Sequence, residues 1–143
     1  MIEERGGKIY VDGKRCLTKY NIGSFTSGDT VFTVVTYGSE LNKKPHFHLY
    51  TNDRSIKCAI GIYEPIYIKH KKSKGRLNES QIKDMIKWLQ EDEYLEILEK
   101  YIGPYWQSIR SIWNTTYGNR IQPEHGHYRT DIPFPDYMKL LEY

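Results

Sequence analysis

Apolar and polar residues alternate in short runs through the first half of the chain, a pattern typical of antiparallel β-strands. Residues 31–37 form the clearest run, because they are β-branched or aromatic throughout. In residues 55–62, apolar side chains at alternate positions predict a strand with one buried face. Residues 8–11 and 14–17 flank an Asp-Gly pair, which is a strong signal for a two-residue hairpin.

Shorter segments complete the predicted sheet. Residues 44–50 are expected to form a strand that carries two histidines, and residues 66–68 a short edge strand. Residues 24–29 are rich in turn formers, with Ser27-Gly28-Asp29 at the tip of the expected turn, and a second turn is expected at residues 51–54.

The second half of the chain has helical periodicity. Asn78 and Gln81 have the spacing of a capping box, and a helical face of apolar residues follows from Ile82 to Leu89. A second helix is expected over residues 92–101, and Pro104 is expected to open a third. From residue 117 the pattern becomes irregular, and residues 137–141 are expected to form a last helical turn.

These elements predict an α+β fold: an antiparallel sheet of about five strands in the N-terminal half, with about three helices packed on one face and an irregular C-terminal tail. We expect residues 1–116 to form a single domain. Residues 117–143 form a tail that is too apolar to be disordered in solvent. The tail is expected to pack on the body or on a partner, including a second copy in a homodimer.

Composition narrows the class of protein. A formal net charge of +3 over 143 residues is too small to argue for nucleic-acid binding from the overall field. Cys16 and Cys58 are far apart and form no C-x-x-C pair, which favours a reduced, cytoplasmic chain. The N-terminus lacks the apolar run of a signal peptide, and no stretch approaches the roughly 20 apolar residues of a membrane span.

His46 and His48 lie two residues apart in a predicted strand, so their side chains are expected to point to the same face. Imidazole titrates near neutral pH and binds borderline metals, so the pair is a candidate metal clamp or catalytic acid/base pair. The alternative is two polar residues on the solvent face of the strand. Ala59 and Gly61 would line the same face if the next strand pairs antiparallel, and would leave room for a ligand or another chain segment.

His125 and His127 form a second pair with the same spacing, in the tail. Together with His46 and His48, this pair has the nitrogen ligands for one tetrahedral zinc or another divalent metal. The alternative is a polar bend in a loop, and the sequence does not show whether the two pairs meet.

A dense basic run covers residues 69–76 and leads into the helix that begins after Asn78. A helix N-terminus favours anions, and nearby lysines strengthen that field, so a phosphate of a nucleic acid or nucleotide is the expected ligand. The alternative is a solvated loop between sheet and helix. The candidate phosphate-binding residues are Lys69, Lys71, Lys72, Lys74 and Arg76.

Residues 44–113 resemble a family of small bacterial proteins that carries only a domain-of-unknown-function label. The residues that carry the resemblance are Pro45, His46, His48, Ala59, Ile60, Trp88, Leu89 and Trp113. The resemblance covers about half the chain. It implies a small α+β fold and a gene beside toxin–antitoxin genes or on phages and other mobile elements, with no established reaction.

The sequence is therefore consistent with three functions. The first is a small cytoplasmic interaction protein of a phage, mobile element or toxin–antitoxin-like system, acting on a protein or nucleic-acid partner. The second is a metal-dependent nuclease or phosphoesterase, in which His46 and His48 hold the ion, His125 or His127 completes the site, and residues 69–76 hold phosphate. The third is a metal-free ribonuclease with histidines as general acid and base.

Overall fold

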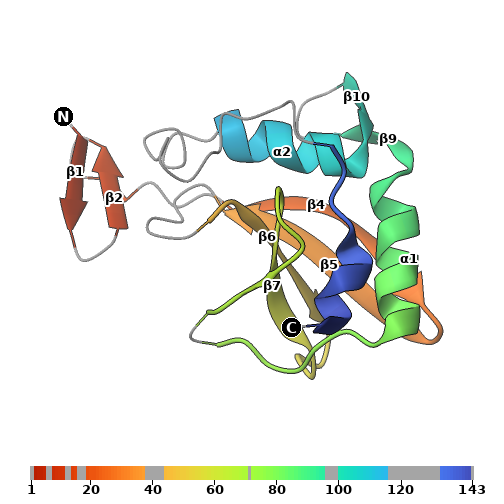
Figure 1. Ribbon diagram of the computed structural model, residues 1–143. Helices are drawn as coiled ribbons and strands as arrows, with labels where there is room; N and C mark the ends of the chain where they lie inside the picture. Colours follow the sequence, from red (N-terminus) through yellow and green to blue (C-terminus); the bar gives the residue numbers. More distant parts are fainter. Residues whose placement is uncertain are drawn as a thin grey trace.

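Five antiparallel strands form the main sheet, in the order β4-β5-β6-β7-β8 (Figure 1). Each strand pairs with its neighbour in the sequence, so the sheet is a simple meander. The strands are β4 (Lys19–Ser27), β5 (Thr30–Tyr37), β6 (His46–Thr51), β7 (Lys57–Gly61) and β8 (Tyr67–Ile68). This computed structural model describes residues 2–5, 8–11, 14–15, 19–37, 44–70, 72–95, 100–115 and 133–142.

A separate small sheet precedes the main one and consists of β1 (Ile2–Arg5), β2 (Lys8–Val11) and β3 (Lys14–Arg15). In the pairing of β2 with β3, Tyr10 lies opposite Arg15 and Val11 opposite Lys14. This register confirms the hairpin predicted from the Asp-Gly pair.

The two faces of the main sheet differ in character. Phe47 and Leu49 of β6 are buried on the face that the helices cover, which we call the core face. Because strand side chains alternate, His46, His48 and Tyr50 lie on the opposite face, which we call the outer face.

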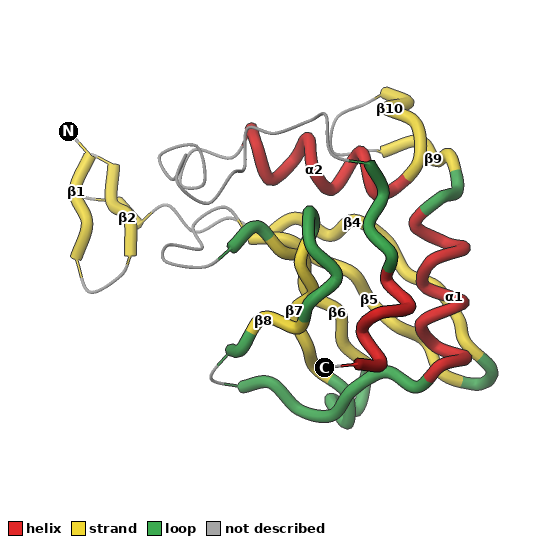
Figure 2. The backbone as a smooth tube through the Cα atoms, viewed as in Figure 1, coloured by secondary structure: helices red, strands yellow, loops and turns green. Residues whose placement is uncertain are grey.

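Three helices cover the core face. They are α1 (Glu79–Leu89), α2 (Tyr105–Thr115) and the 3₁₀-helix η3 (Tyr137–Glu142). Figure 2 shows α1 running alongside the sheet, α2 crossing its end, and η3 packed near α1. The predicted capping box is confirmed, since Asn78 Oδ1 accepts from the Gln81 amide at 2.8 Å and Gln81 Oε1 accepts from the Asn78 amide at 2.9 Å. The α+β prediction, with its five-stranded sheet and three helices, is confirmed. No described helix is long and apolar enough to cross a membrane.

The end of the chain packs on the body. Tyr137 and Leu140 are buried in the same core as the sheet and α1. The Tyr137 hydroxyl donates to the Gly61 carbonyl at 2.8 Å, which ties η3 to the end of β7. The domain boundary at residue 116 stays a prediction.

Two predicted elements are wrong. Residues 24–27 belong to β4 rather than to a turn, because Phe25 pairs with Phe32 and both are buried in the core; the turn itself is confined to the residues around Gly28. Within residues 92–101 the structure has strands in place of a helix: β9 (Asp92–Leu95) pairs with β10 (Lys100–Pro104). Here strand pairing overrides a helical spacing of apolar residues, which is a weak local signal.

Candidate metal centre

Two histidines of the site come from β6. His46 lies directly opposite Gly61 and His48 opposite Ala59 in the antiparallel pairing with β7. The expectation that these two small residues line the same face as the histidines is confirmed. At Gly61 the space that a larger side chain would need is filled by another segment of the chain, because a Cβ there would collide with the Glu64 carbonyl oxygen.

The third histidine, His70, comes from the loop between β8 and α1 (Figure 2). A turn holds it in place: the His70 carbonyl accepts from the Ser73 amide at 3.1 Å, and the His70 amide donates to Ser73 Oγ at 3.2 Å. The loop then returns to the sheet, where Lys74 and Lys57 exchange two backbone hydrogen bonds of 2.8 and 2.9 Å. The segment that carries His70 is thus held to the sheet on both sides, by β8 before it and by Lys74 after it.

The three imidazole rings converge through their Nε2 atoms. Nε2 of His46 lies 3.2 Å from Nε2 of His48 and 3.0 Å from Nε2 of His70. One nitrogen from each ring lies within 4.8 Å of the others. Tetrahedral zinc with bonds of 2.0–2.1 Å places neighbouring nitrogens about 3.3 Å apart. The three histidines are therefore close enough to bind one metal ion.

The tautomer of His46 follows from its second ring nitrogen. Nδ1 of His46 lies 2.7 Å from the Lys44 carbonyl oxygen. A carbonyl oxygen only accepts, so Nδ1 carries the proton and the neutral ring has its lone pair on Nε2, facing the other two histidines. A backbone carbonyl on the far nitrogen is a common way for proteins to orient a metal-binding histidine.

The segment before β6 holds this carbonyl in place. Pro45 favours an extended conformation at Lys44, and the Pro45 carbonyl accepts from the Ile62 amide at 2.9 Å. Lys44 Nζ also pairs with a Glu64 carboxylate oxygen at 3.1 Å, although both side chains are more than half exposed and the pair adds little stability.

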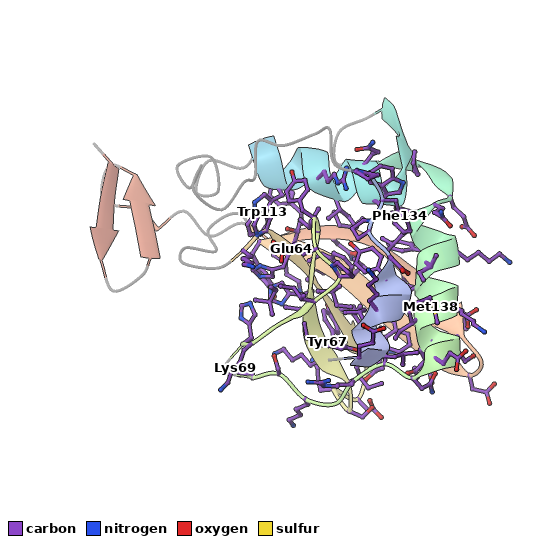
Figure 3. All side chains as sticks on the ribbon, in the orientation of Figure 1. Glu64, Tyr67, Lys69, Trp113, Phe134 and Met138 are labelled. Atoms are coloured by element: carbon purple, nitrogen blue, oxygen red, sulfur yellow. The ribbon has the colours of Figure 1, made fainter. Side chains whose placement is uncertain are left out.

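Aromatic rings enclose part of the site. The ring centre of Trp113, from the end of α2, lies 5.1 Å from the ring centre of His46. The rings of Tyr37 and His48 meet in a T-shaped contact with 4.9 Å between their centres. Figure 3 shows Trp113 reaching from α2 toward the strands and Lys69 pointing away from the body. His46 is fully buried, whereas His48 and His70 are half-buried. The site is therefore closed behind His46 and reaches solvent at the other two rings.

Two of the four predicted metal ligands lie in the cluster of three histidines that the structure brings together. His46 and His48 are in the cluster, but His125 and His127 lie outside the described residues, so their part in it stays a prediction. His70 was missed, because it was read as one member of a basic run. Its position depends on how the loop folds back over the sheet, which strand periodicity does not reveal.

The described residues of the basic run are mostly exposed. Lys69, Lys72, Lys74 and Arg76 are exposed, and Lys71 lies outside the described residues. The Arg76 guanidinium stacks over the Tyr67 ring at 4.9 Å. Whether these residues bind phosphate stays a prediction.

The start of α1 is a weaker anion site than the sequence suggests. The capping box already occupies the Gln81 amide, and Glu79 places a carboxylate in the first turn. An anion near this loop would therefore depend on the lysine side chains more than on the helix end.

Comparison of the chain with protein-family models, with curated proteins and with solved structures found no significant match. The resemblance of residues 44–113 to a family of small bacterial proteins stays a prediction, and the function is inferred from the site itself.

Proposed function

We propose that the protein binds one divalent transition-metal ion, with zinc as the first candidate, through Nε2 of His46, His48 and His70. We further propose that it uses this ion to hydrolyse phosphoesters. The observation that carries the proposal is the convergence of three Nε2 atoms, with separations of 3.2 and 3.0 Å from His46.

A shared ion explains this convergence better than hydrogen bonds within the cluster. In its neutral form His46 has one lone pair, on Nε2, because its Nδ1 donates to the Lys44 carbonyl. One lone pair accepts one well-aligned hydrogen bond, yet two nitrogens approach it at hydrogen-bonding distance. A metal ion would accept a lone pair from each of the three rings at once.

The ligand type favours a borderline metal. Imidazole nitrogens suit zinc, copper, nickel and iron, whereas magnesium and calcium require oxygen ligands. Three protein ligands leave a fourth position for water or substrate, which is the arrangement of catalytic zinc sites. The two half-buried rings, His48 and His70, make that position reachable from solvent.

The chemistry then follows from the ion and its surroundings. A zinc ion with three histidine ligands lowers the pKa of a bound water to about 7 and so provides hydroxide at neutral pH. The exposed cations of Lys69 and Lys72, on the loop that carries His70, would attract a phosphate group to this loop. Phosphoester hydrolysis uses both features.

The other two functions have less support. A metal-free ribonuclease needs an acid and a base on opposite sides of the reacting phosphate, whereas here the ring nitrogens point toward one another. The interaction-protein hypothesis stays a prediction, because it depends on a partner of unknown chemistry and does not account for the histidine cluster.

The test is reconstitution. Chelator-treated protein should take up about one equivalent of zinc by elemental mass spectrometry and then hydrolyse bis-p-nitrophenyl phosphate. His70→Ala should lose both properties. Lys83→Ala should retain both, because Lys83 is exposed on α1, where it forms an ion pair with Glu79. Full activity in excess chelator, or zinc uptake unchanged in His70→Ala, would contradict the proposal.

A further inference from the structure

A second group of residues on the outer face lies beside the histidine cluster and has no part in it. Tyr50 is two residues beyond His48 on the same strand and face, which places it about 7 Å further along β6. Two cationic side chains, Lys19 and Arg54, contact Tyr50, and Lys57 lies directly opposite it on β7. We call Lys19, Tyr50, Arg54 and Lys57 the Tyr50 platform.

Arginine and tyrosine are stacked in the platform. The guanidinium carbon of Arg54 lies 3.9 Å from the centre of the Tyr50 ring. Lys19, the first residue of the edge strand β4, donates from Nζ to the Tyr50 hydroxyl at 3.4 Å. The Tyr50 ring therefore carries a stacked guanidinium and a nearby ammonium, and the exposed guanidinium offers a flat cationic surface of its own.

The backbone of Arg54 is held in an unfavourable conformation. Its φ angle is +61°, and among the described residues it is the only one other than glycine with a positive φ. The surrounding turn is well fixed, since Asp53 Oδ1 accepts from Thr51 Oγ1 at 2.7 Å and from the Ser55 amide at 3.0 Å. Glycine would fit this position with less strain. An arginine at such a strained position is consistent with a role for its side chain.

Positive charges predominate on this part of the outer face, with the Asp53 carboxylate in the adjoining turn. Lys57 lies directly opposite Tyr50 on one side and opposite Lys74 on the other. Like charges placed directly across a strand pair repel each other. The described positions of β5, β6 and β7 on the outer face carry no carboxylate, and Val35, His46, Ala59 and Gly61 among them are buried; the positions are Val31, Thr33, Val35, Tyr37, His46, His48, Tyr50, Lys57, Ala59 and Gly61. A polyanion bound here would relieve the repulsion.

We propose that the Tyr50 platform binds single-stranded nucleic acid, with a base stacked on Tyr50 and Arg54 and phosphates at Lys57 and Lys74. Stacking on an aromatic ring or a guanidinium plane requires an unpaired base, so a single strand fits where a duplex does not. With Tyr50 about 7 Å from His48, a strand held here passes the histidine cluster. The inference that single strands are the substrate rests on the proposed function, whereas binding of a single strand to the Tyr50 platform needs no metal.

The experiment is fluorescence anisotropy with labelled single-stranded DNA and RNA 12-mers and a matched duplex, in EDTA. The single strands are expected to bind more tightly than the duplex. Tyr50→Ala is expected to weaken binding roughly five-fold to a hundred-fold. Lys57→Ala should reduce the slope of log affinity against log salt by about 0.7. Lys83→Ala, which removes the same charge from α1, should behave as wild type.

Arg54→Gly separates binding from folding. It should leave the urea midpoint close to that of wild type, because relief of the positive φ offsets the lost contacts with Tyr50 and Thr51, while weakening single-strand binding at least five-fold. Equal affinity for duplex and single strand, or Tyr50→Ala and Arg54→Gly proteins that bind as tightly as Lys83→Ala, would overturn the proposal. Because the assay contains chelator, failure of the zinc site would leave its result unchanged. Zinc-dependent hydrolysis by a protein that does not bind single strands would overturn the substrate class alone.

Discussion

His70→Ala should remove most of the stabilisation that zinc gives the protein. A ligand that binds only the folded state at a hundred times its Kd adds about 2.7 kcal/mol to the free energy of unfolding. For a chain of 143 residues, each kcal/mol raises Tm by about 4 °C. Wild-type protein with zinc should therefore melt roughly 10 °C above chelator-treated protein.

The size of the loss in His70→Ala follows from the geometry. Changing a residue that only orients a ligand costs 10-fold to 100-fold in metal affinity, and losing one of three nitrogens should cost at least 100-fold. At the same zinc concentration the variant then gains about 0.4 kcal/mol or less, which is roughly 2 °C. His70 is half-buried on a loop, so the variant is expected to fold and to serve as its own metal-free reference.

The assay is thermal unfolding followed by circular dichroism, with wild type, His70→Ala and Lys83→Ala, each in chelator and in zinc. Lys83→Ala should gain as much as wild type, since it lies on α1 away from the histidines. The reasoning is refuted if zinc leaves the wild-type Tm unchanged, or if His70→Ala gains the full shift.

Two further predictions concern buried groups outside the site. Tyr137→Phe should lower the free energy of unfolding by about 1–3 kcal/mol in urea titrations at pH 7, because the buried Gly61 carbonyl loses its donor. Burial also raises the pKa of Tyr137 above its usual value, so the stability that the neutral hydroxyl gives the folded state is present below about pH 10 and is lost as the pH rises further. Between pH 9 and 11 the free energy of unfolding of Tyr137→Phe should therefore fall less than that of wild type. An identical fall in both proteins would contradict the buried, neutral state of Tyr137. Burial raises the pKa of the Cys58 thiol to about 12. In a Cys16→Ser variant, which leaves Cys58 as the one thiol, a thiol reagent at pH 8 should therefore react only after the protein unfolds. Rapid reaction of the native protein would show that the Cys58 thiol is accessible.

The parts of the fold that follow from short-range rules could be predicted from the sequence. Strand periodicity places His46 and His48 on one face, and antiparallel pairing brings Ala59 and Gly61 beside them. The capping box at Asn78 is another local feature, because both of its hydrogen bonds lie within four residues.

The parts that depend on tertiary contacts could not be predicted in this way. Phe25 lies in a Ser- and Thr-rich segment that resembles a turn, yet its ring packs 5.1 Å from that of Phe32 and draws the segment into β4. Residues 92–101 have apolar residues at helical spacing, but pairing between β9 and β10 prevails.

His70 shows the same limit within the site. Its ring reaches His46 only because the chain leaves β8, turns at Ser73 and returns to pair with Lys57. None of these steps has a periodic signal in the sequence. The basic residues around His70 favour a phosphate loop when read alone, and the structure adds a third imidazole to the pair on β6.

The most direct test of the central claim is anomalous diffraction at the zinc absorption edge, from crystals of the chelator-treated protein reloaded with zinc. The account predicts one anomalous peak about 2.0–2.1 Å from Nε2 of His46, His48 and His70, and no such peak in crystals of His70→Ala. The absence of a peak at these three nitrogens in zinc-loaded wild-type protein would contradict the claim that they share one ion.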